Sequence, residues 1–158
     1  MWMRRGQQAQ VVTPGSNTKH YLAGSLNWWT GELILTNPGP RRNADLFLAH
    51  LDELRRRFRR YRRIHVICDN AAFHQPKRCQ KVQDYLRWWG HRIEVHFLPT
   101  YAPETNPIER VWWHLHEEIT RNHRCRNIDE LVNLVFDWLA AGSYFGTETS
   151  LYDSAHAA

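Results

Sequence analysis

Long hydrophobic runs are missing from this 158-residue sequence, in which no stretch reaches the roughly 18 apolar residues of a membrane-spanning helix. The N-terminal residues 1–6 include the charged Arg4 and Arg5, but no apolar stretch of the length found in a secretory signal follows them. The sequence also lacks the low hydrophobic content of disordered chains, since 42% of its residues are hydrophobic and eight are Trp. This composition excludes a disordered chain. We therefore expect one soluble, cytoplasmic domain without a membrane partner.

Paired metal-binding spacings are absent too. The three cysteines include no Cys-x-x-Cys pair, so neither a disulfide framework nor a zinc knuckle is indicated. The ten histidines lack a helical i, i+4 pair of the zinc type, since His114 and His116 stand only two positions apart. His65 and Cys68 share a predicted strand that has no second pair in sequence, and this spacing argues against zinc.

Acidic residues are scarce in one segment, residues 41–63, which contains nine arginines and only three acids. This segment supplies the whole basic excess of a chain whose net charge is +5. Guanidinium groups suit phosphate, so the candidate DNA backbone contacts are Arg55, Arg56, Arg59, Arg60 and Arg63. An arginine-rich host proteome would produce the same bias without any binding role.

The hydrophobic periodicity predicts an α/β fold. Short strands are expected at residues 10–13, 19–26 and 33–35, with a turn at residues 29–32. Buried strands are expected at residues 64–68 and 92–98. Helices are expected after Asn43, from Pro76 to Gly90, from Ile108 onward, and over residues 128–141. The buried stripe of the first helix is Phe47, Leu51, Leu54, Phe58 and Tyr61. This order of elements predicts a mixed sheet flanked by helices, followed by a polar tail at residues 142–158.

Two pairs of adjacent tryptophans, residues 88–89 and 112–113, fall on predicted helices. Successive helical residues point in different directions, so one Trp of each pair is expected in the core and its neighbour at the surface. Stacking on splayed bases is the alternative role for these rings.

Two acids can carry chemistry. Asp69 follows a predicted strand, where side chains of α/β sheets gather at ligand sites, and Glu109 begins a helix after a loop rich in proline. Converging carboxylates hold Mg²⁺ or Mn²⁺, and two such ions stabilise in-line displacement at phosphorus. The structural alternative is that Asp69 belongs to a turn and that Glu109 completes a capping box with Asn106.

Two segments carry a family resemblance, ICDNAAFH at residues 67–74 and LPTYAPETNPIERVW at residues 98–112. In this order and spacing they resemble the second half of the Asp-Asp-Glu (DDE) catalytic domain of mariner-like transposases from bacterial insertion sequences. The resemblance extends through WMRRG at residues 2–6 and AGSL at residues 23–26, so it covers about residues 1–141.

The resemblance implies a ribonuclease H-like fold, DNA as the substrate, Mg²⁺ or Mn²⁺ as the cofactor and a homo-oligomer in the complete transposase. It makes Asp69 the second metal-binding aspartate and Glu109 the third acidic ligand. Asn70, His74 and Asn106 match polar positions of the motifs, for which we expect supporting or DNA-contacting roles.

One feature of the family is missing from the sequence. The family's first aspartate lies on a strand upstream of the position where Trp2 aligns, and the first acidic residue here is Glu32, in a predicted hairpin turn. The helix-turn-helix region of such transposases is also absent. We therefore expect an N-terminally truncated catalytic domain, from a start codon assigned too late, a decayed element or a split reading frame. The rival interpretation is a non-enzymatic DNA-binding or dimerising remnant.

Overall fold

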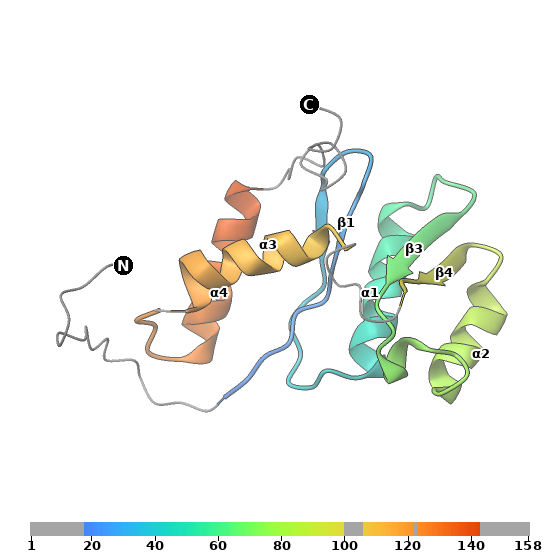
Figure 1. Ribbon diagram of the computed structural model, residues 1–158, viewed down its shortest axis with the longest axis horizontal. Helices are drawn as coiled ribbons and strands as arrows, with labels where there is room; N and C mark the ends of the chain where they lie inside the picture. The colour runs from blue at the N-terminus through green and yellow to red at the C-terminus, as the bar shows by residue number, and fades with distance from the viewer. Residues whose placement is uncertain (1–17, 100–105, 122, 143–158) are drawn as a thin grey trace.

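Two pairs of strands form the β structure of the computed structural model, which describes residues 18–99, 106–121 and 123–142 (Figure 1). Strand β1 (Gly24–Leu26) runs antiparallel to β2 (Leu33–Leu35), with Gly24 opposite Leu35. Strand β3 (Ile64–Cys68) runs parallel to β4 (Ile93–Phe97), with Ile64 opposite Ile93. The predicted mixed α/β fold is confirmed, and within the described residues its strands form two separate pairs.

The β1–β2 hairpin turns where the sequence predicts it. The Asn27 side chain accepts hydrogen bonds from the backbone N–H groups of Trp29 and Thr30, which tightens the loop. Gly31 has φ of 74°, a left-handed conformation that glycine adopts without steric cost. The N-terminal part of the predicted strand at residues 19–26 makes only an isolated bridge, between Tyr21 and Gly39.

Helix α1 (Ala44–Arg57) begins at the predicted cap, because the Asn43 side chain accepts a hydrogen bond from the Leu46 N–H at 3.1 Å. It ends earlier than its hydrophobic stripe predicts. Phe58 is the C-cap, and Tyr61 lies beyond the helix with 64% of its surface exposed, so its assignment to the buried stripe is wrong. The chain turns here because Ile64 must pair with Ile93 in the parallel sheet.

Helix α2 (Gln80–Trp89) also differs at its start. It begins four residues after Pro76, which lies in a turn rather than in the first helical turn. Gly90 closes the helix as predicted, and its N–H donates to the Leu86 carbonyl at 2.8 Å. A short 3₁₀ turn, η1 (Ala72–His74), connects β3 to this region.

The two C-terminal helices pack together at the far side of the hairpin (Figure 1). Helix α3 (Ile108–Leu115) continues into a π-helical turn, η3 (His116–Thr120), which the sequence does not predict. Helix α4 (Ile128–Ala141) has the predicted bounds, and the Asn127 side chain caps it by accepting from the Glu130 N–H at 2.8 Å. No helix in the described part of the chain is long and apolar enough to cross a membrane.

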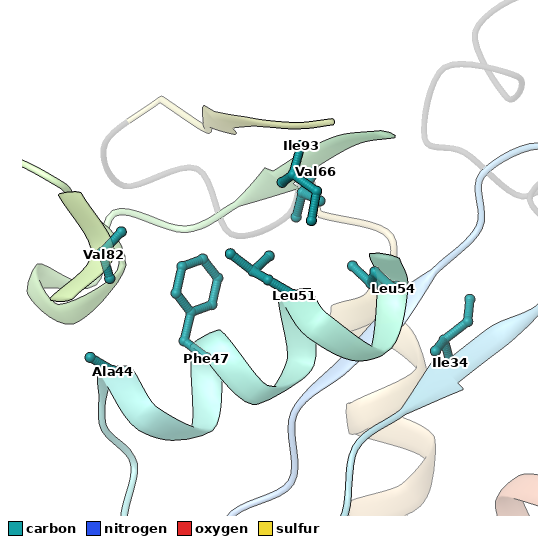
Figure 2. Close-up of a cluster of buried hydrophobic side chains, with 8 residues drawn as sticks. All are labelled: Ile34, Ala44, Phe47, Leu51, Leu54, Val66, Val82 and Ile93. Atoms are coloured by element: carbon teal, nitrogen blue, oxygen red, sulfur yellow. The ribbon is translucent and has the colours of Figure 1, made fainter. Parts of the chain in front are cut away.

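Two hydrophobic cores lie on opposite sides of the hairpin. The larger core joins α1 to β3, β4 and α2, and Figure 2 shows Phe47, Leu51 and Leu54 reaching from α1 toward Val66 and Ile93. The smaller core joins α3 to α4. Strand β2 contributes side chains to both cores, because successive strand residues point to opposite faces. Ile34 packs in the larger core, and Leu33 and Leu35 pack against the smaller one.

Each tryptophan pair has one exposed ring, Trp88 or Trp113, and one partly buried ring, Trp89 or Trp112. Trp112 packs against the smaller core as predicted, whereas Trp89 lies against the Arg55 guanidinium and not in the larger core. Several predicted features lie outside the described residues: the segment 2–6, the strand at residues 10–13, the loop at residues 100–105 and the tail from residue 143 onward.

Candidate functional site

A cleft of about 720 Å³ lies between β1 and β3. Every residue of β3 and all residues of 22–26 line it. Successive strand residues point to opposite faces, so a strand that lines a cleft with every residue presents its backbone edge to it. Since β1 pairs only with β2 and β3 only with β4 in the described residues, two unpaired sheet edges border one cleft. Side chains of α1 line it as well.

Asp69 lies in this cleft at the carboxyl end of β3. Its Oδ1 accepts a hydrogen bond from the Ala71 N–H at 3.1 Å and lies 2.6 Å from His74 Nδ1. The His74 ring is only 17% exposed and packs against Phe47, with 4.2 Å between ring centroids. His74 therefore fixes one oxygen of a carboxylate whose side chain is 63% exposed and open to a ligand.

Glu109 lines the same cleft from the first turn of α3. The alternative of a capping box is not seen among the described residues, where Pro107 is the N-cap of α3 and no side-chain hydrogen bond caps the helix. Partial desolvation raises the pKa of Glu109, and the negative charge of Asp69 raises it further. The helix thus carries the second acid into the electrostatic range of the first.

The other polar residues of the two motifs have different surroundings. The Asn70 amide donates to the Leu98 carbonyl, which ties the loop after β3 to the chain after β4. Gln75 in turn donates to the Asn70 carbonyl at 3.0 Å. Asn106 lines the cleft, and its carbonyl accepts from the Glu109 N–H at 3.0 Å. The Asn70 side chain therefore holds the segment that carries Asp69, whereas the Asn106 contact is a backbone bond at the start of α3.

Close packing of α3 on β1 positions Glu109. Gly24 makes this approach possible, since a Cβ at this position would lie 2.8 Å from Cη2 of Trp112. Ile108 and Val111 are buried beside Trp112 in the smaller core. The part of α3 that follows Glu109 therefore packs against the β1–β2 hairpin.

His50 is a cleft residue that the sequence pattern does not single out. It is 3% exposed, and its Nε2 lies 2.7 Å from Ser25 Oγ while its Nδ1 lies 2.7 Å from Thr36 Oγ1. Burial lowers the pKa of His50 from 6.5 to about 4, so the ring is neutral near pH 7. Its position in the buried stripe of α1 was the available signal, because a histidine between Phe47 and Leu54 must find polar partners.

Cys68 and Glu32 take no part in an acid cluster. Burial, and then the adjacent charge of Asp69, raise the pKa of the Cys68 thiol to about 12, which keeps it protonated. Glu32 forms an ion pair with Arg57 and ties the hairpin turn to the end of α1. Glu32 is not among the residues that line the cleft, so it supplies no third acid there.

The predicted basic cluster is divided between a helix and a turn. Arg55 and Arg56 lie on α1, whereas Arg59, Arg60 and Arg63 follow it. The Arg55 guanidinium lies 3.1 Å from Asp52 and 3.7 Å from the centroid of the Trp89 ring, so it contributes to packing of α1 on α2. The other four arginines are exposed.

Comparisons with known proteins agree with this architecture. The sequence model of a family described as DDE superfamily endonuclease matches residues 1–132. A 39 kDa protein of insertion element IS630 from Shigella sonnei, itself described as uncharacterized, is 37% identical over 144 residues. That match covers 91% of this chain and 40% of the relative, so the chain spans less than half of the relative's length.

A solved structure has a similar fold. The crystal structure of the Mos1 mariner paired end complex with Mn matches with a TM-score of 0.57 at 19% identity. The match covers 89% of this chain and 43% of that chain. At this identity the similarity concerns the fold of the chain.

Proposed function

Because this chain belongs to the DDE superfamily of endonucleases, we propose that it forms part of the catalytic domain of an insertion-element transposase that cleaves and joins DNA. Residues 1–141 form the ribonuclease H-like part, and residues 142–158 are a polar tail. The substrates are the element ends and target DNA in the cytoplasm, and the complete transposase acts as a homo-oligomer. The solved relative was crystallised as a paired end complex with Mn, which agrees with both DNA and a divalent ion.

The observation that carries the proposal is the presence of two carboxylates in one cleft. Asp69 and Glu109 come from segments 40 positions apart, yet the charge of Asp69 acts on Glu109 and raises its pKa. Two carboxylates held close together make ionisation of one of them harder, which raises its pKa. Such pairs are typical of sites that bind a cation. A structural capping role for Glu109 does not account for this, since no side-chain hydrogen bond caps α3 within the described part of the chain.

The donor set fits Mg²⁺ or Mn²⁺. Carboxylate oxygens are the hard ligands that these ions prefer, and one or two of them suffice because the ion keeps several waters. When bound, such ions neutralise the charge that develops on phosphate oxygens during in-line displacement. Asp69 and Glu109 would hold the ion, and His74 keeps one Asp69 oxygen occupied so that the carboxylate has a fixed orientation. The Asn70 side chain holds the segment after β3 in place, and Asn106 lines the cleft.

The cleft also has room for a further strand. An extended segment between β1 and β3 would hydrogen-bond to both unpaired edges and join the two pairs into one sheet. In this proposal the segment is the family's first strand, and its aspartate meets Asp69 and Glu109. That third carboxylate would complete the ligand set for the ions, and without it we expect this chain to cut DNA poorly.

A plasmid-nicking assay with Mg²⁺ or Mn²⁺ tests the proposal. It compares this chain with a version extended upstream to include the family's strand, and it repeats the extended version with Asp69→Asn, Glu109→Gln and the control Asp84→Asn. Asp84 is exposed on α2 and does not line the cleft. We expect cutting by the extended chain and its Asp84→Asn variant only.

Two results would overturn parts of this proposal. Cutting by the extended Asp69→Asn and Glu109→Gln variants at the rate of Asp84→Asn would remove both acids from the reaction. Robust cutting by the unextended chain would show that another acid replaces the one on the missing strand.

The open strand edges also favour a second function, a non-enzymatic fragment that pairs with a complete transposase. In that case, the extended chain would stay inactive while the present chain inhibits an intact relative in the same assay.

A further inference from the structure

A second group of metal-ligating side chains lies on β3 and β4 and includes neither Asp69 nor Glu109. It consists of His65, Glu94 and His96, whose ligand atoms all lie within 4.8 Å of one another. His65 Nδ1 is 3.0 Å from His96 Nε2 and 3.8 Å from Glu94 Oε2. His96 Nε2 is 3.9 Å from Glu94 Oε1. The three side chains are between 44% and 58% exposed, so an ion can reach them from solvent.

The parallel register creates this cluster. His65 is paired directly with Glu94, and His96 lies two positions further along β4 on the same face as Glu94. The two histidines are 31 positions apart in sequence, which is why sequence spacing gives no metal signal. Both sit on paired strands, which hold ligands more precisely than loops do.

We propose that this cluster, here called the His-Glu-His site, binds Zn²⁺. Two imidazole nitrogens and one carboxylate oxygen are a common zinc ligand set, with Zn–N and Zn–O distances near 2.0 to 2.2 Å. Two nitrogens on one tetrahedral zinc ion lie roughly 3.3 Å apart at those bond lengths, so the present 3.0 Å needs only a small separation of the rings. The fourth position is left for water.

Proton positions must change when the ion binds. The 3.0 Å contact between His65 and His96 requires one of the two facing nitrogens to carry a proton. Both facing nitrogens must offer lone pairs to a metal, so the donating ring moves its proton to its other nitrogen. Metal ligation uses the neutral form of each imidazole, in which the other ring nitrogen keeps its proton.

The His-Glu-His site is distinct from the proposed Mg²⁺ or Mn²⁺ site. Asp69 comes four residues after His65 and two residues after Ile67, the strand partner of His96, and the two sites share no ligand. The ligand types differ as well, since imidazole favours Zn²⁺ and pure carboxylate sets favour Mg²⁺ and Mn²⁺. This inference therefore goes beyond the proposed function and does not depend on DNA cleavage.

Arg63 supplies a specific way to test the assignment. Its Nη1 lies 3.3 Å from Glu94 Oε2, so it competes for the carboxylate and adds a positive charge beside the ion. Replacing Arg63 by Ala should strengthen zinc binding, by roughly two- to fivefold, which is the range of an exposed ion pair.

The experiment is titration of the purified chain with ZnCl₂ near pH 7.5, read by calorimetry and by competition with a chromogenic chelator. His65→Ala and His96→Ala should each weaken binding by about tenfold or more. His91→Ala is the matched control, because His91 is exposed just before β4 and lies outside the cluster. Thermal melting without zinc verifies that each variant folds.

Several outcomes would overturn the site. Affinities of His65→Ala and His96→Ala equal to that of His91→Ala would leave only a hydrogen-bonded histidine pair. A weaker rather than stronger affinity in Arg63→Ala would contradict the role of Glu94. If a histidine variant does not fold, the Arg63→Ala result and X-ray absorption of zinc in the unchanged chain, which should show two imidazoles and one carboxylate, decide the matter.

Discussion

Asp69 and Glu109 form the residue pair on which the proposed chemistry depends, and each acid has its own support. His74 and the Ala71 N–H hold Asp69, whereas helix α3 carries Glu109. Because the two charges interact, the ionisation of one reports on the presence of the other. A single substitution can therefore measure their proximity without any assay of activity.

We predict that Asp69→Asn lowers the pKa of Glu109. Removing a neighbouring negative charge makes ionisation of the remaining carboxyl easier, while the desolvation of Glu109 persists. Carbon-13 NMR titration of the Glu109 carboxyl in the two proteins measures the change, with Asp84→Asn as the control. An unchanged Glu109 titration in Asp69→Asn would mean that the acids do not share a site.

A second residue-scale prediction concerns His50 and pH. Burial lowers its pKa to about 4 in the folded chain, against 6.5 when unfolded, so protons bind the unfolded state more tightly. The contribution of the neutral His50 ring to the free energy of unfolding is fully present above pH 6.5 and is lost as the pH falls toward 4. A difference of about 2.5 units corresponds to about 3 kcal/mol of unfolding free energy.

Urea unfolding at several pH values between 7 and 4 measures this effect. His50→Gln should be less stable than the parent at pH 7, because it loses packing and hydrogen bonds to Ser25 and Thr36. Its stability should then fall less steeply with pH than that of the parent, whereas exposed His91→Gln should follow the parent. Parallel profiles for all three proteins would refute the prediction.

The sequence pattern predicts the positions of the two acids but not the contacts that the buried and paired histidines make. Asp69 could be predicted because it ends an apolar strand, and Glu109 because a motif places it at the start of a helix. The polar partners of His50 and the contact between His65 and His96 depend on which strands become neighbours. That information lies in tertiary packing, which local spacing does not contain.

At the scale of elements, the packing of α3 on β1 determines where Glu109 lies. We predict that Gly24→Ala destabilises the chain by about 1–3 kcal/mol, since the added methyl meets the Trp112 ring at 2.8 Å. Gly39→Ala is the control, because its nearest neighbour would be Leu46 Cδ1 at an ordinary 3.8 Å. Urea midpoints compare the two, and equal midpoints would show that Trp112 moves aside at no cost.

Element boundaries show where local pattern is overridden. The apolar spacing continues past Arg57 to Tyr61, yet α1 ends at Arg57 because the chain must turn back into β3. Conversely, α4 has its predicted bounds, since Asn127 caps one end and Gly142 the other. Boundaries fixed by capping residues are readable in sequence, whereas those fixed by strand pairing are not.

At the scale of the whole molecule, charge should govern DNA binding. We predict weak, sequence-independent binding with a steep salt dependence, because each phosphate contact releases counterions. Arg56, Arg59 and Arg63 are exposed, and the ion pairs of Arg56 with Glu53 and of Arg63 with Glu94 are of the weak surface type. Replacing all three by Ala should reduce the salt slope by up to about 2.7, since each phosphate that is no longer neutralised lowers it by about 0.9.

The measurement is DNA affinity by fluorescence anisotropy at several salt concentrations. A triple variant of Arg78, Arg87 and Arg124 provides a control of equal charge, since these residues are exposed outside the basic segment. Equal flattening of the slope in both variants would locate DNA binding across the whole surface rather than near the end of α1.

The hairpin shared by the two cores has a consequence for cooperativity. Only three residue pairs connect β1 and β2, yet Ile34 belongs to one core and its neighbours Leu33 and Leu35 to the other. The two halves should therefore open as separate units, with amide protons around α3 and α4 exchanging independently of those around α1 and β3. A strand seated in the cleft would link the halves through its own ladder of hydrogen bonds, and the two exchange rates would merge into one.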